Sequence, residues 1–236
     1  MKGWAILLVL LSGLFIFFLV RNSPQQGEID KLEKFNIIVT SEEDQGQNSP
    51  SRTTGASEKG SSANEKVLFI IAQNNFRDEE LTKPKKILEN AGYDVDVASI
   101  TTDQTRGMMG LIVKPDLAVI DVNVSLYALV VVVGGSGAPS LANYPEVLSL
   151  LKKAITENKK IAGICLGPVV LAKAGVLQGK NATVFKSTSP DSVAILQSGG
   201  ANFVDKSLVT DGWLVTANGP AVSQEFGDAL VKLLQS

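Results

Sequence analysis

The residue best suited to chemistry is Cys165, the one cysteine of the chain, which stands between Gly163 and Gly167. Flanking glycines permit the strained turn that presents a nucleophile between a strand and a helix, as in the Gly-x-Ser-x-Gly elbow of hydrolases. A helix that begins after the turn would direct the positive end of its dipole toward the sulfur and stabilise a thiolate. A lone cysteine is often only a small buried apolar residue, but this setting favours a reactive thiol.

Backbone N–H groups near this turn could bind the negative charge that develops on a reacting carbonyl oxygen. The first is that of Leu166, directly after the cysteine. A second donor is expected at Gly134 or Gly135, because the GGSG segment follows another apolar run. In open α/β sheets such strands end at the same carboxyl edge, where ligands bind.

The chain contains no histidine, which is the usual base for a nucleophilic cysteine. Cys–His catalysis is therefore excluded for this chain alone, and a homodimer could not supply the base either. With one cysteine there is no internal disulfide, and zinc has almost no ligands, so we expect neither metal nor cofactor. The formal net charge of -2, without a basic stripe, argues against binding of nucleic acid.

The elements that must position this thiol follow from apolar runs and helical patterns. Strands are expected at 66–72, 94–100, 128–135 and 161–165, with further strand segments at 182–185, 201–205 and 207–218. Helices are expected at 79–93, 145–160, 166–175 and 222–234, the first kinked or delimited by Pro84. This alternation predicts an α/β fold with a mostly parallel sheet and helices on both faces.

Two segments with a different composition precede this domain, which we place at residues 66–236. Residues 4–20 are uncharged and mostly apolar, so residues 1–22 are expected to be an uncleaved membrane anchor or a signal segment. Residues 23–65 are expected to be a flexible linker, since 41–65 contain no large apolar side chain. We expect a cell-membrane protein with an extracytoplasmic domain, the alternative being a cleaved and secreted one.

The domain resembles the ThiJ/PfpI family of the class I glutamine amidotransferase-like superfamily. The resemblance rests on KVLFIIA, FRDEELTKP, AGYDVDVAS, ALVVVVGGSGAPSL, KKIAGICLGPVVLAKAGVLQGKNATVF and LVTANGPAVSQEFGDALVKLL, which together span essentially all of residues 66–236. It implies a flavodoxin-like three-layer sandwich with Cys165 at its elbow, and an assembly of identical subunits. It also implies that Glu80 approaches the thiol and holds it reactive, while Asp78 and Glu79 are expected to be solvated acids of the first helical turn.

The sequence departs from the pattern that this family uses. Members similar to PfpI carry a histidine directly after the cysteine, where this chain has Leu166. Members of the deglycase and glyoxalase branch place a histidine after the next strand, at or near Phe185. The resemblance therefore leaves a helix-stabilised thiolate, with Glu80 as the proton carrier.

Three functions fit these residues. The first is cysteine-dependent chemistry on reactive carbonyls or their protein adducts, of the glyoxalase or deglycase type. The second is a cysteine peptidase or amidase, which suffers most from the missing histidine because an amine leaving group needs a proton. The third is a non-enzymatic thiol redox sensor or chaperone-like module, in which Cys165 is oxidised. The expected partner is a small-molecule or peptide substrate, together with the membrane contacted by residues 4–20.

Overall fold

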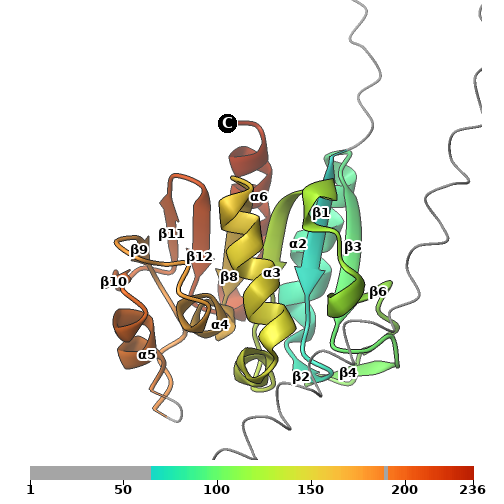
Figure 1. Ribbon diagram of the computed structural model, residues 1–236, viewed down its shortest axis with the longest axis horizontal. Helices are drawn as coiled ribbons and strands as arrows, with labels where there is room; N and C mark the ends of the chain where they lie inside the picture. The colour runs from blue at the N-terminus through green and yellow to red at the C-terminus, as the bar shows by residue number, and fades with distance from the viewer. Residues whose placement is uncertain (1–64, 189–190) are drawn as a thin grey trace, which may run out of the picture. The chain divides into compact units, whose positions relative to one another are not determined.

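The computed structural model describes residues 65–188 and 191–236, which contain a central seven-stranded sheet (Figure 1). Its strand order is β11-β12-β8-β7-β1-β3-β6, and all neighbours are parallel except β11 and β12. The strands are β1 (Lys66–Ile70), β3 (Asp94–Ser99), β6 (Leu117–Ala118), β7 (Tyr127–Val132), β8 (Lys160–Ile164), β11 (Leu208–Asp211) and β12 (Leu214–Ala217). The predicted α/β architecture with a mostly parallel sheet is confirmed.

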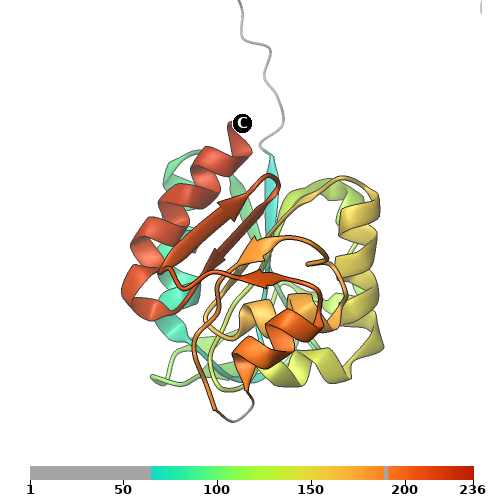
Figure 2. The ribbon, with the colours of Figure 1, turned by 90° about the vertical axis from the view of Figure 1, so that its left-hand side faces the viewer.

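Helices cover both faces of this sheet, as the two views in Figures 1 and 2 show. On one face α2 (Asp78–Asn90) packs against α6 (Ser223–Leu234), and on the other α3 (Pro145–Thr156) packs beside α4 (Gly167–Lys173). A further helix, α5 (Ser192–Ser198), packs on α4. The apolar runs of the central strands are buried because both faces are covered, as is typical of parallel sheets.

Smaller elements complete the described residues. Two short sheets are formed by β2 (Asn74–Phe76), β4 (Thr105–Gly107) and β5 (Ile112–Val113), and by β9 (Asn181–Ala182) and β10 (Asn202–Phe203). Four 3-10 turns are η2 (Val119–Asp121), η3 (Val124–Leu126), η4 (Ala138–Asn143) and η5 (Pro220–Val222). None of α5, β2 or β4 was predicted from the sequence, because each is short and carries no clear period.

Pro84 was predicted either to kink the first helix or to end it. Helix α2 continues through Pro84, so the proline does not end it. The proline is buried where α2 meets α6, and Gly227 of α6 leaves room for it. A Cβ at Gly227 would lie 3.1 Å from the Pro84 Cα. The proline thus lies in close contact with α6 while α2 continues past it.

Among residues 65–188 and 191–236, no helix has the length and apolar character that crossing a membrane requires. The predicted anchor at residues 4–20 and nearly all of the predicted linker lie outside the described residues.

The turn after β8 depends on close contact between α4 and β7. Gly167 begins α4, and a Cβ placed there would lie 2.3 Å from the carbonyl oxygen of Val132. Any side chain at this position must therefore push the helix away from the strand that ends beside the site.

We expect Gly167→Ala to lower the free energy of unfolding by about 3 kcal/mol, near the upper end for overpacking. Gly175→Ala is the matched control, because Gly175 has φ +71° and a methyl group added there would meet no atom within 4 Å. Left-handed backbone alone costs an alanine about 1 kcal/mol. Urea unfolding of the three proteins measures the difference, and equal losses would contradict the close contact.

Candidate active site

Cys165 lies directly after β8 in a left-handed backbone conformation, with φ 59°. Such a conformation is costly for a residue other than glycine, and it persists only where surrounding contacts hold it. Here the Cys165 N–H donates to the carbonyl of Ala217 at 2.8 Å, and its own carbonyl accepts from Phe185 N–H at 2.9 Å. The cysteine is thus fixed in the strained turn that the sequence predicted, with 7% of its surface exposed.

Glu80 reaches the same point from the first turn of α2. Its side chain is fully buried, and Oε2 accepts a hydrogen bond from the Gly134 N–H at 3.1 Å. A Cβ at Gly134 would lie 2.4 Å from both the Cys165 Cβ and Glu80 Oε2. Only a glycine at the end of β7 therefore allows the carboxyl and the cysteine to meet. The other oxygen, Oε1, has no hydrogen-bond partner among the described residues.

The backbone donors expected from the sequence divide between two tasks. Gly135 and Leu166 provide N–H groups that interact with the Cys165 sulfur. Gly134 instead gives its N–H to Glu80, so this residue positions the acid and does not bind an oxyanion. A reacting oxygen beside the sulfur would therefore find its donors at Gly135 and Leu166.

Burial favours the protonated form of both side chains at the site. It raises the pKa of Glu80 to about 8, with smaller opposing effects from Cys165 and the Gly134 N–H. It also raises the pKa of Cys165 to about 12, and the charge that Glu80 would carry is the second cause. This direction differs from the helix-stabilised thiolate expected from the sequence, because removing the sulfur from water outweighs the N–H groups of Gly135 and Leu166.

Protonation of Glu80 affects the pKa of the Cys165 thiol. Without the negative charge of the carboxylate, the second cause of the raised Cys165 pKa disappears. The carboxyl O–H is then a donor toward the sulfur or toward a bound oxygen. The two groups share their protons, so they titrate as a pair and lose the first proton together.

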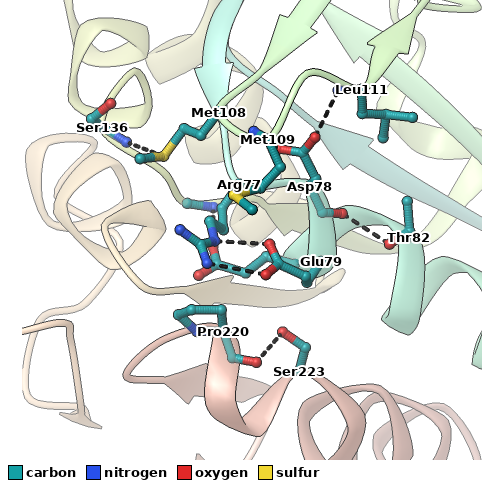
Figure 3. A network of polar contacts seen from close by, with 12 residues as sticks. Arg77, Asp78, Glu79, Thr82, Met108, Met109, Leu111, Ser136, Pro220 and Ser223 are labelled. Atoms are coloured by element: carbon teal, nitrogen blue, oxygen red, sulfur yellow. Dashed lines mark hydrogen bonds and ion pairs between the residues drawn. The ribbon is translucent and has the colours of Figure 1, made fainter.

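The acids beside Glu80 behave differently from one another. Asp78 was expected to be solvated, but it is buried and accepts hydrogen bonds from the N–H groups of Met109 at 2.9 Å and Leu111 at 2.8 Å (Figure 3). It thereby fixes the loop after β4 against α2. Glu79 forms an ion pair with Arg77 in two hydrogen bonds of 2.8 and 3.0 Å. Both residues are acids in the first turn of a helix, so the sequence alone does not distinguish the buried Asp78 from the ion-paired Glu79.

The positions at which the family histidines were expected are both next to the elbow. Leu166 is buried, and Phe185 is 45% exposed and bound through its N–H to the cysteine carbonyl. Neither side chain can accept a proton. Glu80 is therefore the proton-carrying side chain that the structure brings to Cys165.

These features define the class: an α/β domain with a nucleophile elbow and a buried carboxyl beside its cysteine. Residues 65–233 match the sequence profile of the DJ-1/PfpI family. The chain therefore belongs to the DJ-1/PfpI family.

Characterised and uncharacterised relatives cover the same domain. A Methanocaldococcus jannaschii protein without an assigned function is 39% identical over 173 residues, which are 73% of this chain and 83% of the relative. A deglycase of Pyrococcus horikoshii is 34% identical over 170 residues, which are 72% of this chain and 99% of the relative. YraA of Bacillus subtilis, provisionally named a cysteine protease, is 32% identical over 172 residues, 72% of this chain and 99% of that protein.

Solved structures show the same fold. A ThiJ/PfpI domain protein of Brachyspira murdochii superposes with a TM-score of 0.69 at 33% identity, covering 74% of this chain and 98% of the other. DJ-1beta of Drosophila melanogaster superposes with a TM-score of 0.65 at 28% identity, covering 73% and 95%. The flavodoxin-like fold implied by the resemblance is therefore confirmed.

The raised pKa of Glu80 makes folding stability depend on pH. The folded protein holds this proton up to about pH 8, whereas the unfolded chain releases it near the ordinary glutamate pKa of 4.5. Between these two pH values the folded state binds more protons than the unfolded state. The contribution of Glu80 to the free energy of unfolding is therefore greatest below pH 4.5 and falls as the pH rises toward 8. With no histidine in the sequence, no other side chain of ordinary pKa titrates between pH 5 and 8.

We expect the free energy of unfolding to fall from pH 5 to pH 8 by a few kcal/mol, on the order of 4. Glu80→Gln, which keeps the shape without the ionisation, should flatten this profile. Glu225→Gln, on an exposed position of α6, should leave it unchanged. Urea unfolding at a series of pH values measures each profile, and a flat curve for the unsubstituted protein would refute a proton held by Glu80.

Proposed function

We propose that this domain performs cysteine-dependent chemistry on reactive carbonyl compounds or on their adducts with protein groups. Cys165 is the nucleophile and Glu80 is the proton carrier. The observation that carries the proposal is the fully buried Glu80 carboxyl, whose pKa burial raises to about 8, beside the strained Cys165. Four relatives named as deglycases support this class of reaction.

The first step is addition of the thiol to an aldehyde. A bond forms between sulfur and the carbonyl carbon, and the π electron pair of the carbonyl moves to oxygen. Glu80 gives its proton to that oxygen and receives the thiol proton, so the product is a neutral hemithioacetal. The N–H groups of Gly135 and Leu166 stabilise the charge that develops on the oxygen.

A 2-oxoaldehyde can continue from this hemithioacetal by an internal proton shift. Glu80, protonated by the thiol in the first step, releases this proton to water and as a carboxylate removes the proton from the former aldehyde carbon. It then returns that proton to the neighbouring carbon, while the hydroxyl proton of the hemithioacetal passes to the oxygen on that neighbouring carbon. The result is a thioester of a 2-hydroxy acid, which one water molecule cleaves to the free acid and the thiol. Electrons and atoms balance without an external oxidant, because one carbon is oxidised as its neighbour is reduced.

A peptidase or amidase is the second candidate, favoured by the provisional name of the Bacillus subtilis relative. Its amine leaving group needs a proton donor on the far side of the tetrahedral intermediate, and Leu166 and Phe185 provide none. A thiol redox sensor is the third candidate, and it would use the same Cys165 through its oxidation. We therefore place carbonyl chemistry first.

We expect the protein to convert methylglyoxal to lactate, and Cys165→Ser to abolish this turnover. Glu80→Gln should lower kcat/KM by about 100-fold or more, because proton transfer in the transition state is lost. Glu225→Gln is the matched control on the exposed surface of α6. Chiral analysis of lactate measures the reaction. Cleavage of casein, with methylglyoxal untouched, would instead establish the peptidase.

We also propose that residues 4–20 attach the domain to the cell membrane, with the domain on the extracytoplasmic side. The support is the uncharged, apolar composition of this segment. The full chain should sediment with membranes and resist carbonate extraction, and a chain without residues 1–22 should not. Recovery of the expressed protein in the medium, shortened at its N-terminus, would show a cleaved signal instead.

A further inference from the structure

Arg77 lies at the site but has no part in the chemistry described so far. It immediately precedes α2, and its N–H donates to the carbonyl of Gly134 at 3.0 Å. Gly134 is the residue across which Glu80 and Cys165 meet. The backbone of Arg77 is therefore attached to the same turn that holds both reacting groups, and its side chain remains 27% exposed.

The guanidinium uses only one of its edges in the described structure. Nε and Nη2 donate to the two carboxylate oxygens of Glu79, as Figure 3 shows. No described residue accepts a hydrogen bond from Nη1. Guanidinium carries five N–H donors in a planar fork, so a second carboxylate can bind along the outer edge formed by Nη1 and Nη2.

The charges around Arg77 leave room for an anion. The Glu79 carboxylate is occupied by the guanidinium itself, and that of Asp78 is bound by two N–H groups of the loop after β4. Burial raises the pKa of Glu80 to about 8, so this neighbour is largely uncharged at neutral pH. The hydrogen bond with Glu79 is the largest cause that raises the pKa of Arg77, and the charges of Glu80 and Cys165, when present, raise it further.

Two further side chains beside the turn, Met108 and Phe185, are uncharged. Met108 is exposed, and its sulfur accepts a hydrogen bond from Ser136 N–H, the residue after Gly135. The Phe185 side chain is exposed, and its backbone N–H donates to the carbonyl of Cys165. A carbonyl compound at Cys165 would thus meet apolar or neutral groups from these elements and a cation from Arg77.

We propose that Arg77 binds a carboxylate on the substrate, and that the site selects carbonyl compounds that carry one over neutral aldehydes. A 2-oxoaldehyde with a carboxylate chain, such as 4,5-dioxopentanoate, is the class of substrate expected. This inference rests on the proposed function for the reaction, but recognition of an anion beside Cys165 can be measured separately.

The test compares two alkylating agents of nearly equal size, iodoacetate and iodoacetamide, on the full-length protein in detergent. Both transfer their methylene carbon to the Cys165 sulfur and release iodide, and only iodoacetate carries a carboxylate. The ratio of their rates therefore reports anion recognition at the thiol and cancels changes in thiol reactivity. Cys165 is the only cysteine of the sequence, so mass spectrometry follows one product.

We expect Arg77→Gln to lower the iodoacetate to iodoacetamide rate ratio by about fivefold, the size of a partly exposed ion pair. Glu79→Gln should raise the ratio, because it removes the competing carboxylate. Arg106→Gln takes the same charge from an exposed position on β4 and should leave the ratio unchanged. A ratio that is the same in all four proteins would overturn the proposal, as would equal effects of Arg77→Gln and Arg106→Gln.

Turnover separates this inference from the proposed function. Arg77→Gln should lower kcat/KM for 4,5-dioxopentanoate relative to methylglyoxal. If both compounds are converted and this relative preference does not change, the inference on Arg77 fails while the function stands. If neither is converted by the unsubstituted protein, the function fails, and the alkylation ratio alone decides whether Arg77 recognises an anion.

Discussion

The structure of the site depends on one close approach, that of the Glu80 carboxyl to Cys165 across Gly134. Two strands must end and one helix must begin at this point: β7 ends before Gly134, β8 ends before Cys165, and α2 has Glu80 in its first turn. The parallel sheet achieves this because neighbouring strands end at the same edge. Close contacts at the glycines then set the spacing, so a methyl group at Gly134 or Gly167 would separate the parts.

Burial at this meeting point determines how charge can be used. A carboxylate and a thiolate cannot both be stabilised there, since both groups are removed from water and the charge of Glu80 raises the pKa of Cys165. The pair therefore holds at most one negative charge near neutral pH. Glu80 can thus hold a proton beside the thiol, where other cysteine enzymes place a histidine. The same burial lowers stability at higher pH, so the site is maintained at a cost to the fold.

Much of the fold could be predicted from the sequence, because apolar runs such as KVLFIIA and ALVVVV identify buried parallel strands directly. The turn at Cys165 was also predictable from its glycines. The role of Asp78 was not, because its partners Met109 and Leu111 come from a loop about thirty residues away that has no pattern of its own. Nor was the course of α2 through Pro84, which packs beside Gly227 of a helix at the far end of the chain.

The side chains of Phe185 and Leu166 limit the reactions that this site can catalyse. Neither can carry a proton, so every transfer must pass through Glu80 or through water. A reaction that moves a proton between neighbouring carbons needs only one such carrier, and the carboxyl already lies beside the sulfur. Amide cleavage also requires a proton donor for the amine leaving group, a task that histidine performs in peptidases and that Leu166 and Phe185 cannot perform. The geometry of a single proton carrier at a buried thiol thus favours isomerising carbonyl chemistry over peptide hydrolysis.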